Sequence, residues 1–206
     1  MVDVLTHSRR DLRRIQEETR KAASYLAVSR AVFRVPGFAS RWTNSECQWA
    51  MEYNQKGTHM AFAVTLAATY EEKSSGDVIS IPKLIKRFRT APLLEAIARD
   101  QHRTHSEVEA AARKAVRKFE RIKALPIYGS LRKLRHNVIA HHNREIDRHG
   151  ATPRALNRLM VATLVLVDRM SITLNAETTD TRDIVAYVRD TAVKFWDRGM
   201  DGDPTT

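Results

Sequence analysis

The 206-residue sequence has a single cysteine, Cys47, and it lacks any long apolar stretch. One cysteine excludes an intrachain disulfide, and a lone cysteine is more often a small buried hydrophobic residue than a nucleophile. The longest apolar run, residues 159–167, is too short for a bilayer, which takes about 20 residues. The N-terminal stretch has no apolar run either, so we expect no secretory signal. These absences favour a cytoplasmic protein that does not bind a membrane.

Motifs for metal or nucleotide chemistry are also missing. The seven glycines are scattered and form no phosphate-binding loop, which argues against nucleotide hydrolysis. The chain has no HExxH pattern and no pair of thiolates. His136, His141 and His142, with Glu145, do offer nitrogen and carboxylate ligands, so zinc is an alternative. We nevertheless expect no metal and no other cofactor, because His136 and His141 point in different directions around a helix.

The spacing of apolar residues predicts helices separated by short breaks. Pro153 at a first helical position, behind Thr152 as its cap, marks the start of one of them. No strand pattern of convincing length is present, so we expect an all-α, up-and-down helical bundle. The length of the chain suits one domain, residues 1–198, followed by a disordered tail, residues 199–206. The expected helices cover residues 8–33, a segment from the cap at 43–46 to 70, 92–101, 105–124, 130–148, 153–176 and 180–198.

Aromatic residues Trp42, Trp49 and Tyr53 fall near one face of the second of these helices. Large rings bury much apolar area, so we expect this stripe to belong to the core.

Positive charge is concentrated in one part of the chain. The net charge is +11, with a pI of about 10.1, and residues 83–135 hold 15 Lys or Arg but only five acids. Such a field attracts a polyanion, and nucleic acid is the most common one in the cytoplasm. Lys114, Lys118 and Arg121 are the candidate RNA-binding residues. The alternative is a solvated basic helix face with no partner.

The stretch LRKLRHNVIAHHN, residues 131–143, places an arginine on a face that should be buried. Helical geometry puts Arg135 in the middle of the apolar arc, His142 about 20° from it and His141 at the edge, about 120° away. The apolar arc contains Ile127, Tyr128, Leu131, Leu134, Val138 and Ile139.

A guanidinium on such a face is costly unless it is paired or hydrated. One explanation is an ion pair with a buried acid such as Glu145 or Asp147. The other is that this face ends in a cleft or meets a second copy of the chain.

The residues LRHNVIAHHN resemble the signature of the HEPN superfamily: an arginine, a polar residue, an apolar stretch and then a histidine. The pattern RxxVIAH is most similar to the one in its abortive-infection branch, the AbiU-type proteins. The resemblance implies an all-α bundle, here with additional N-terminal helices, and a dimeric, metal-independent ribonuclease of phage defence or of a toxin–antitoxin pair. It also implies Arg135 and His141 as catalytic residues. Two features depart from the pattern: Asn137 could take the polar position in place of His136, and His142 adjoins His141.

These residue types suit RNA cleavage because RNA carries its own nucleophile, the 2′-hydroxyl. A histidine can move protons at neutral pH, and the arginine fork fits phosphate oxygens. In this interpretation His141 moves a proton, Arg135 holds the phosphate, and His136 or Asn137 orients other groups. The family wording favours His141 and the helical geometry favours His142, which is therefore the alternative catalytic residue. Two motif copies in a homodimer would supply both proton transfers.

Two other classes of function compete with an endoribonuclease. The first is a non-catalytic HEPN-like module that binds RNA or a protein. The second is an α-helical DNA-binding regulator, which is weaker because no helix-turn-helix with a short glycine turn is evident. RNA, a second copy of the chain and a cognate antitoxin protein are the expected partners.

Overall fold

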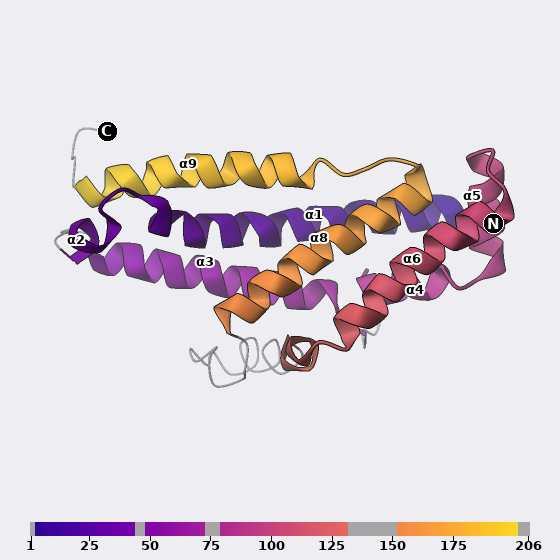
Figure 1. The fold of residues 1–206 in the computed structure, drawn as a ribbon, viewed down its shortest axis with the longest axis horizontal. Coiled ribbons are helices and arrows are strands. Elements are labelled where there is room, and N and C mark those ends of the chain that lie inside the picture. Colours follow the sequence, from indigo (N-terminus) through magenta and orange to yellow (C-terminus); the bar gives the residue numbers. More distant parts are fainter. Residues whose placement is uncertain (1–2, 44–47, 73–78, 132–151, 202–206) are drawn as a thin grey trace. The chain divides into compact units, whose positions relative to one another are not determined.

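The computed structural model describes residues 3–43, 48–72, 79–131 and 152–201, with only the backbone of residues 199–201. All regular elements in these ranges are helices, which confirms the predicted all-α class (Figure 1). The chain forms two compact units. The first unit comprises Met1–Thr19 and Val64–Thr179, and the second comprises Arg20–Ala63 and Asp180–Thr206.

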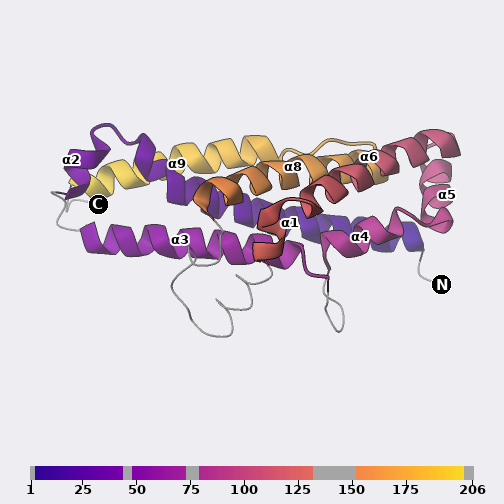
Figure 2. The same ribbon diagram turned by 60° about the horizontal axis from the view of Figure 1, so that its bottom comes forward.

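The first unit contains the segment that was expected to bind RNA. Its helices are α4 (Ile81–Arg87), α5 (Ala91–Asp100), α6 (His105–Lys123) and α8 (Pro153–Asn175), with a short helix at 126–131 (Figure 2). The beginning of α1 (Val4–Ala31) and the end of α3 (Gln48–Thr69) complete it. Its buried side chains include Leu12, Ile15, Leu66, Leu84, Ile97, Phe119, Leu131, Leu159 and Leu166.

A capping box starts α6. The Thr104 hydroxyl accepts from the backbone N–H of Glu107 at 3.3 Å, and Glu107 Oε2 accepts from the backbone N–H of Thr104 at 2.9 Å. Both bonds satisfy N–H groups that the first helical turn leaves without partners. The hydrogen bonds from Thr104 hold the pKa of the Glu107 carboxyl below its ordinary value. The local sequence TxxE therefore fixes where α6 begins.

Two arginine contacts join α1 to the other helices of this unit. Arg9 Nε donates to the carbonyl of Leu174 at the end of α8, and its guanidinium also binds Asp100 in α5. That hydrogen bond lowers the pKa of the Asp100 carboxyl. Arg87 Nη1 lies 2.6 Å from Oδ2 of Asp11, whose side chain is only 6% exposed. These contacts fix the ends of α4, α5 and α8 against α1.

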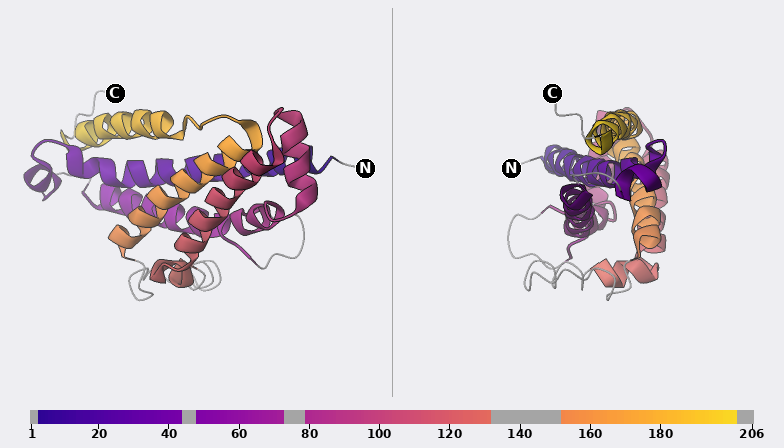
Figure 3. Two further views of the ribbon diagram at one scale, coloured as in Figure 1. Left: turned by 45° about the vertical axis from the view of Figure 1, so that its right-hand side comes forward. Right: turned by 90° about the vertical axis from the view of Figure 1, so that its left-hand side faces the viewer.

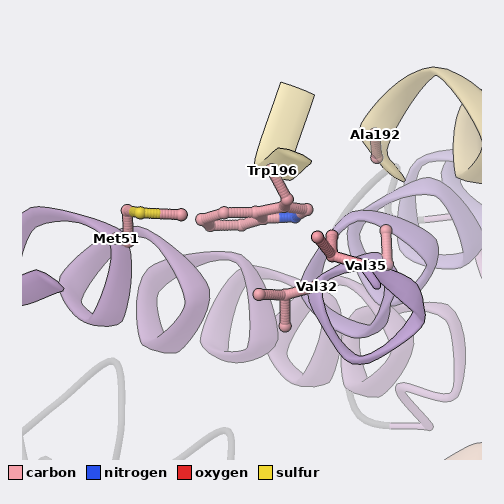
Figure 4. Close-up of a cluster of buried hydrophobic side chains, with 6 residues drawn as sticks. Val32, Val35, Met51, Ala192 and Trp196 are labelled. Atoms are coloured by element: carbon pink, nitrogen blue, oxygen red, sulfur yellow. The ribbon is translucent and has the colours of Figure 1, made fainter. Parts of the chain in front are cut away.

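The second unit is built around one buried tryptophan. Trp196 of α9 (Thr181–Asp201) is fully buried, and its indole N–H donates to the carbonyl of Val28 at 2.9 Å. Figure 4 shows its ring among Val32, Val35 and Met51. The 3-10 helix η1 (Val32–Arg34), the short helix α2 (Phe38–Thr43) and the beginning of α3 supply the surrounding side chains.

The expected helix at 130–148 lies almost wholly outside the described residues. Most of the others lie within a few residues of the observed ones, but three expectations need correction. Residues 38–43 form α2, where the sequence suggested only a break. The aromatic stripe is not core, because Trp49 is 75% exposed and Tyr53 is 77% exposed, and Trp42 alone of the three is partly buried. Trp196 occupies the centre of the core in their place. The last helix also continues beyond Arg198 to Asp201.

Candidate functional site

The five residues expected to carry the chemistry lie outside the described residues. They are Arg135, His136, Asn137, His141 and His142. The structure does describe the two ends between which this motif segment runs. These ends are the helix at 126–131 and the first turn of α8.

The helix at 126–131 buries the side chains that the sequence predicted for its apolar arc. Ile127 and Tyr128 are each 6% exposed and Leu131 is 1% exposed. The Tyr128 ring packs edge-on against Tyr70 and Phe119, with centroid distances of 5.5 and 6.3 Å. This helix is therefore fixed in the first unit up to the residue at which the motif segment begins.

Polar contacts reinforce that position. The Tyr128 hydroxyl donates to Glu72 Oε1 at 3.0 Å, and Lys123 Nζ lies 3.6 Å from the same carboxylate oxygen. The neighbouring Tyr70 hydroxyl is 2.7 Å from the Thr163 hydroxyl of α8. Burial raises the pKa of Tyr70 well above its ordinary value, so Tyr70 is a neutral hydrogen-bonding group at neutral pH.

The far end of the motif segment is a capped helix start. The Thr152 hydroxyl accepts from the backbone N–H of Ala155 at 3.2 Å, and Pro153 stands at the first turn. A proline suits that position because its fixed φ is helical and its missing N–H is not needed there. The cap and the boundary predicted from the sequence are thus both confirmed.

Helices α6 and α8 pack against each other in opposite directions. They lie side by side in all three ribbon views (Figures 1, 2 and 3). Gln101, just before α6, donates to the carbonyl of Thr173 near the end of α8 at 3.2 Å. The end of α6 therefore lies at the same end of the pair as the beginning of α8, where the motif segment starts and finishes.

The surface of α6 is divided into two flanks by its buried face. Val108, Ala112, Ala115, Phe119 and Ile122 are buried. Taking Ala115 as zero and about 100° per residue, one flank spans about +80° to +160° and holds Glu109, Arg113, Glu120 and Lys123. All four of these side chains form ion pairs, with partners Arg113, Glu109, Arg89 and Glu72 respectively.

The opposite flank of α6 is purely cationic over its second half. It spans about −60° to −160° by the same geometry and holds Lys114, Arg117, Lys118 and Arg121. Lys114, Arg117 and Arg121 are exposed and Lys118 is half-buried. None of the four forms an ion pair with a described residue. Three of them are the candidate RNA-binding residues, and the structure places them together on this one flank.

The described part of the chain offers no metal site and no membrane span. No group of three His, Cys, Asp or Glu side chains there could hold a metal ion. Within the same ranges, no helix is long and apolar enough to cross a membrane.

Comparison with models of protein families shows which family the chain belongs to. Residues 9–195 match the model of the HEPN family described as AbiU2. The chain belongs to the AbiU2 family. This match extends over both compact units and confirms the resemblance first seen in residues 134–143. No curated protein and no solved structure matches the chain.

Two further cations of this AbiU2 protein lie near the motif segment and were not predicted from the sequence. Arg154 and Arg158 occupy the first two turns of α8, and both are exposed. They lie outside the basic segment at 83–135, so a count of charge along the chain overlooks them. The antiparallel pairing of α6 and α8, which no local pattern encodes, brings their half of α8 alongside the cationic half of α6.

Proposed function

We propose that this AbiU2-family protein is a metal-independent endoribonuclease that acts in the cytoplasm as an effector of phage defence. One combination of features carries the proposal. In a chain of this family, the arginine–histidine motif lies between the helix at 126–131, which comes soon after α6, and α8. The cationic flank of α6 forms no ion pair with a described residue. The flank provides attraction for a polyanion, and the motif provides groups that can act on a phosphodiester.

The proposed reaction is an internal transesterification. The 2′-oxygen of RNA attacks the adjacent phosphorus, a bond forms between them, and the bond from phosphorus to the 5′-oxygen breaks. His141 moves a proton to or from these oxygens, because a histidine exchanges protons near neutral pH. Arg135 binds the phosphate oxygens and stabilises the charge that develops on them. The products are a 2′,3′-cyclic phosphate and a 5′-hydroxyl.

The proposal includes a homodimer and an inhibitor. One arginine and one histidine do not readily supply both proton transfers, whereas two copies related by a two-fold axis do. Light scattering should then give about twice the 23.5 kDa chain mass. An active monomer at micromolar concentration would contradict the composite site. A cognate antitoxin protein is the expected inhibitor of the enzyme.

Single substitutions in the motif test the catalytic assignment. His141→Ala should keep RNA binding and lower the cleavage rate by roughly two to four orders of magnitude, the usual effect of losing a general acid or base. Arg135→Lys keeps the charge but loses the planar fork, so the rate should also fall strongly while the fold stays intact.

His142→Ala is the matched control for His141→Ala. If His142→Ala is inactive and His141→Ala is fully active, the histidine assignment reverses. If both single variants and the double variant cleave like the wild type, the motif is not a ribonuclease site. If the wild-type protein binds RNA but never cuts it, a non-catalytic binding module replaces the enzyme.

A further inference from the structure

The first two turns of α8 present two exposed arginines. Arg154 and Arg158 are four residues apart and therefore share one face of the helix. That face is opposite to the one that buries Leu156, Leu159 and Met160. Both arginines are exposed, and neither forms an ion pair with a residue in the described ranges. Because both side chains are exposed, an external ligand can reach their guanidinium groups.

The cationic flank of α6 lies on the side of that helix toward α8. Glu120, on the paired flank, binds Arg89 in the segment after α4. Lys123, on the same flank, binds Glu72 after the end of α3. Figure 1 and the left view of Figure 3 show α4 and α8 on opposite sides of α6. The flank that holds Lys114, Lys118 and Arg121 must then be the one on the α8 side.

The antiparallel arrangement brings the two sets of cations to the same end of the pair. Lys114 and Arg121 lie in the second half of α6, and Arg154 and Arg158 lie at the beginning of α8. At a rise of about 1.5 Å per residue, the α6 set extends about 10 Å and the α8 set about 6 Å along their helices. Neighbouring helices pack with their axes about 8–10 Å apart. The two sets thus flank one short strip of surface.

Among the described residues, the strip has no exposed Phe, Tyr or Trp ring on which a base could stack. Every Phe and Tyr side chain in the described part of the first unit is buried, namely Tyr70, Phe88, Phe119 and Tyr128, and no Trp lies there. The large exposed hydrophobic side chains there are aliphatic. Stacking on exposed rings is a main source of affinity for single-stranded bases, so this strip is suited to the phosphodiester backbone.

We propose that Arg154 and Arg158 of α8, together with Lys114, Arg117, Lys118 and Arg121 of α6, form one phosphate-binding strip that holds the RNA backbone without regard to base sequence. The strip leads to the end of the helix pair from which the motif segment departs. This inference rests on the proposed ribonuclease function for its ligand. It adds two arginines of α8 to the binding surface and assigns them to the backbone.

The test measures binding and cleavage separately in the full-length protein. Fluorescein-labelled 20-nucleotide oligo-U and oligo-A are titrated at several salt concentrations, with His141→Ala in every protein so that the probe stays intact. Adding Arg154→Gln and Arg158→Gln should weaken binding to both probes by tenfold or more near 0.1 M salt. The slope of log K against log[salt] should fall by about 1.4, because each single-strand phosphate that is no longer neutralised lowers it by about 0.7.

The matched control removes the same charge elsewhere. Arg182 and Lys194 of α9 are exposed, and Arg182→Gln with Lys194→Gln lowers the net charge by the same amount. This control should change affinity by no more than about twofold, because neither residue belongs to the strip. Circular dichroism melting of both proteins checks the fold. If both double variants lose the same amount of RNA affinity, overall charge explains the binding and the proposed strip is wrong.

Cleavage by the proteins that retain His141 completes the test. Arg154→Gln with Arg158→Gln should raise KM and leave kcat within about threefold, because the strip binds RNA and does not act on the reacting atoms. Unchanged affinity for both probes would overturn the strip, even if the wild type cuts RNA. A wild type that never cuts RNA, but whose binding depends on Arg154 and Arg158, would overturn the nuclease and support the strip. Loss of binding to only one probe would overturn the claim that bases are not recognised.

Discussion

Tyr128 donates a hydrogen bond of 3.0 Å to Glu72, and so joins the helix that enters the motif segment to the residues just after α3. The two residues are 56 positions apart in the chain. Tyr128 is 6% exposed, and its ring packs against Tyr70 and Phe119. Lys123 lies against the same carboxylate, which connects the end of α6 to this point as well.

Tyr128→Phe should therefore destabilise the first unit by about 0.5–1.5 kcal/mol, the usual net contribution of one hydrogen bond. The loss stays modest because Glu72 is exposed and can bind water instead. Urea denaturation followed by circular dichroism measures this change in the free energy of unfolding. Tyr187→Phe is the matched control, because the Tyr187 ring is 73% exposed, and it should change the free energy of unfolding by less than about 0.5 kcal/mol. Equal values for the two variants would contradict the role given to Tyr128.

Trp196 and Trp49 should respond very differently to truncation. Trp196→Ala removes the centre of the second unit's core and the bond to the Val28 carbonyl, so the expected cost is about 3–5 kcal/mol. Trp49→Ala removes a ring that is 75% exposed and should cost about 0.5 kcal/mol or less. Thermal melting at one protein concentration compares them. If Trp49→Ala lost more stability than Trp196→Ala, the aromatic stripe would belong to the core after all.

The buried carboxylate of Asp11 should make the protein sensitive to loss of Arg87. Their atoms are 2.6 Å apart, and the other oxygen of Asp11 has no hydrogen-bond partner among the described residues. Arg87→Met should cost about 2–3 kcal/mol, somewhat below the range for a fully buried pair, because Arg87 is 29% exposed.

The double variant Asp11→Asn with Arg87→Met separates charge from packing. It should recover part of the stability lost in Arg87→Met, since no unpaired charge then stays buried. Chemical denaturation of the four proteins gives the coupling energy. Simple addition of the two single effects would show that the ion pair does not govern stability at this point.

The sequence predicted the helices well where a local signal marks their ends. Thr104 with Glu107, and Thr152 with Pro153, set helix starts by contacts within a few residues, and such signals can be read directly. Which face of a helix is buried depends on what packs against it. Trp49 and Tyr53 have the composition of a core stripe, but Met51 on another face of α3 is the residue that reaches Trp196. That choice rests on contacts between distant segments.

The candidate site shows the same division. Lys114, Lys118 and Arg121 are predicted from the concentration of positive charge alone, and they do share one flank of α6. Arg154 and Arg158 join them only through the antiparallel pairing of α6 and α8, for which the chain carries no short-range signal. The catalytic roles of Arg135 and His141 are inferred from the motif, and they remain predictions because both residues lie outside the described residues.

Analysis of the RNA ends made by the purified wild-type protein in excess EDTA tests the central claim most directly. Total RNA is incubated with protein, and the new ends are identified by their reactivity with polynucleotide kinase before and after acid treatment. The proposed chemistry predicts cleavage that survives chelation and leaves 2′,3′-cyclic phosphate and 5′-hydroxyl ends, with DNA bound but uncut because it lacks the 2′-hydroxyl. Cleavage that stops in EDTA and returns with zinc or magnesium, or that leaves 5′-phosphate ends, would contradict it.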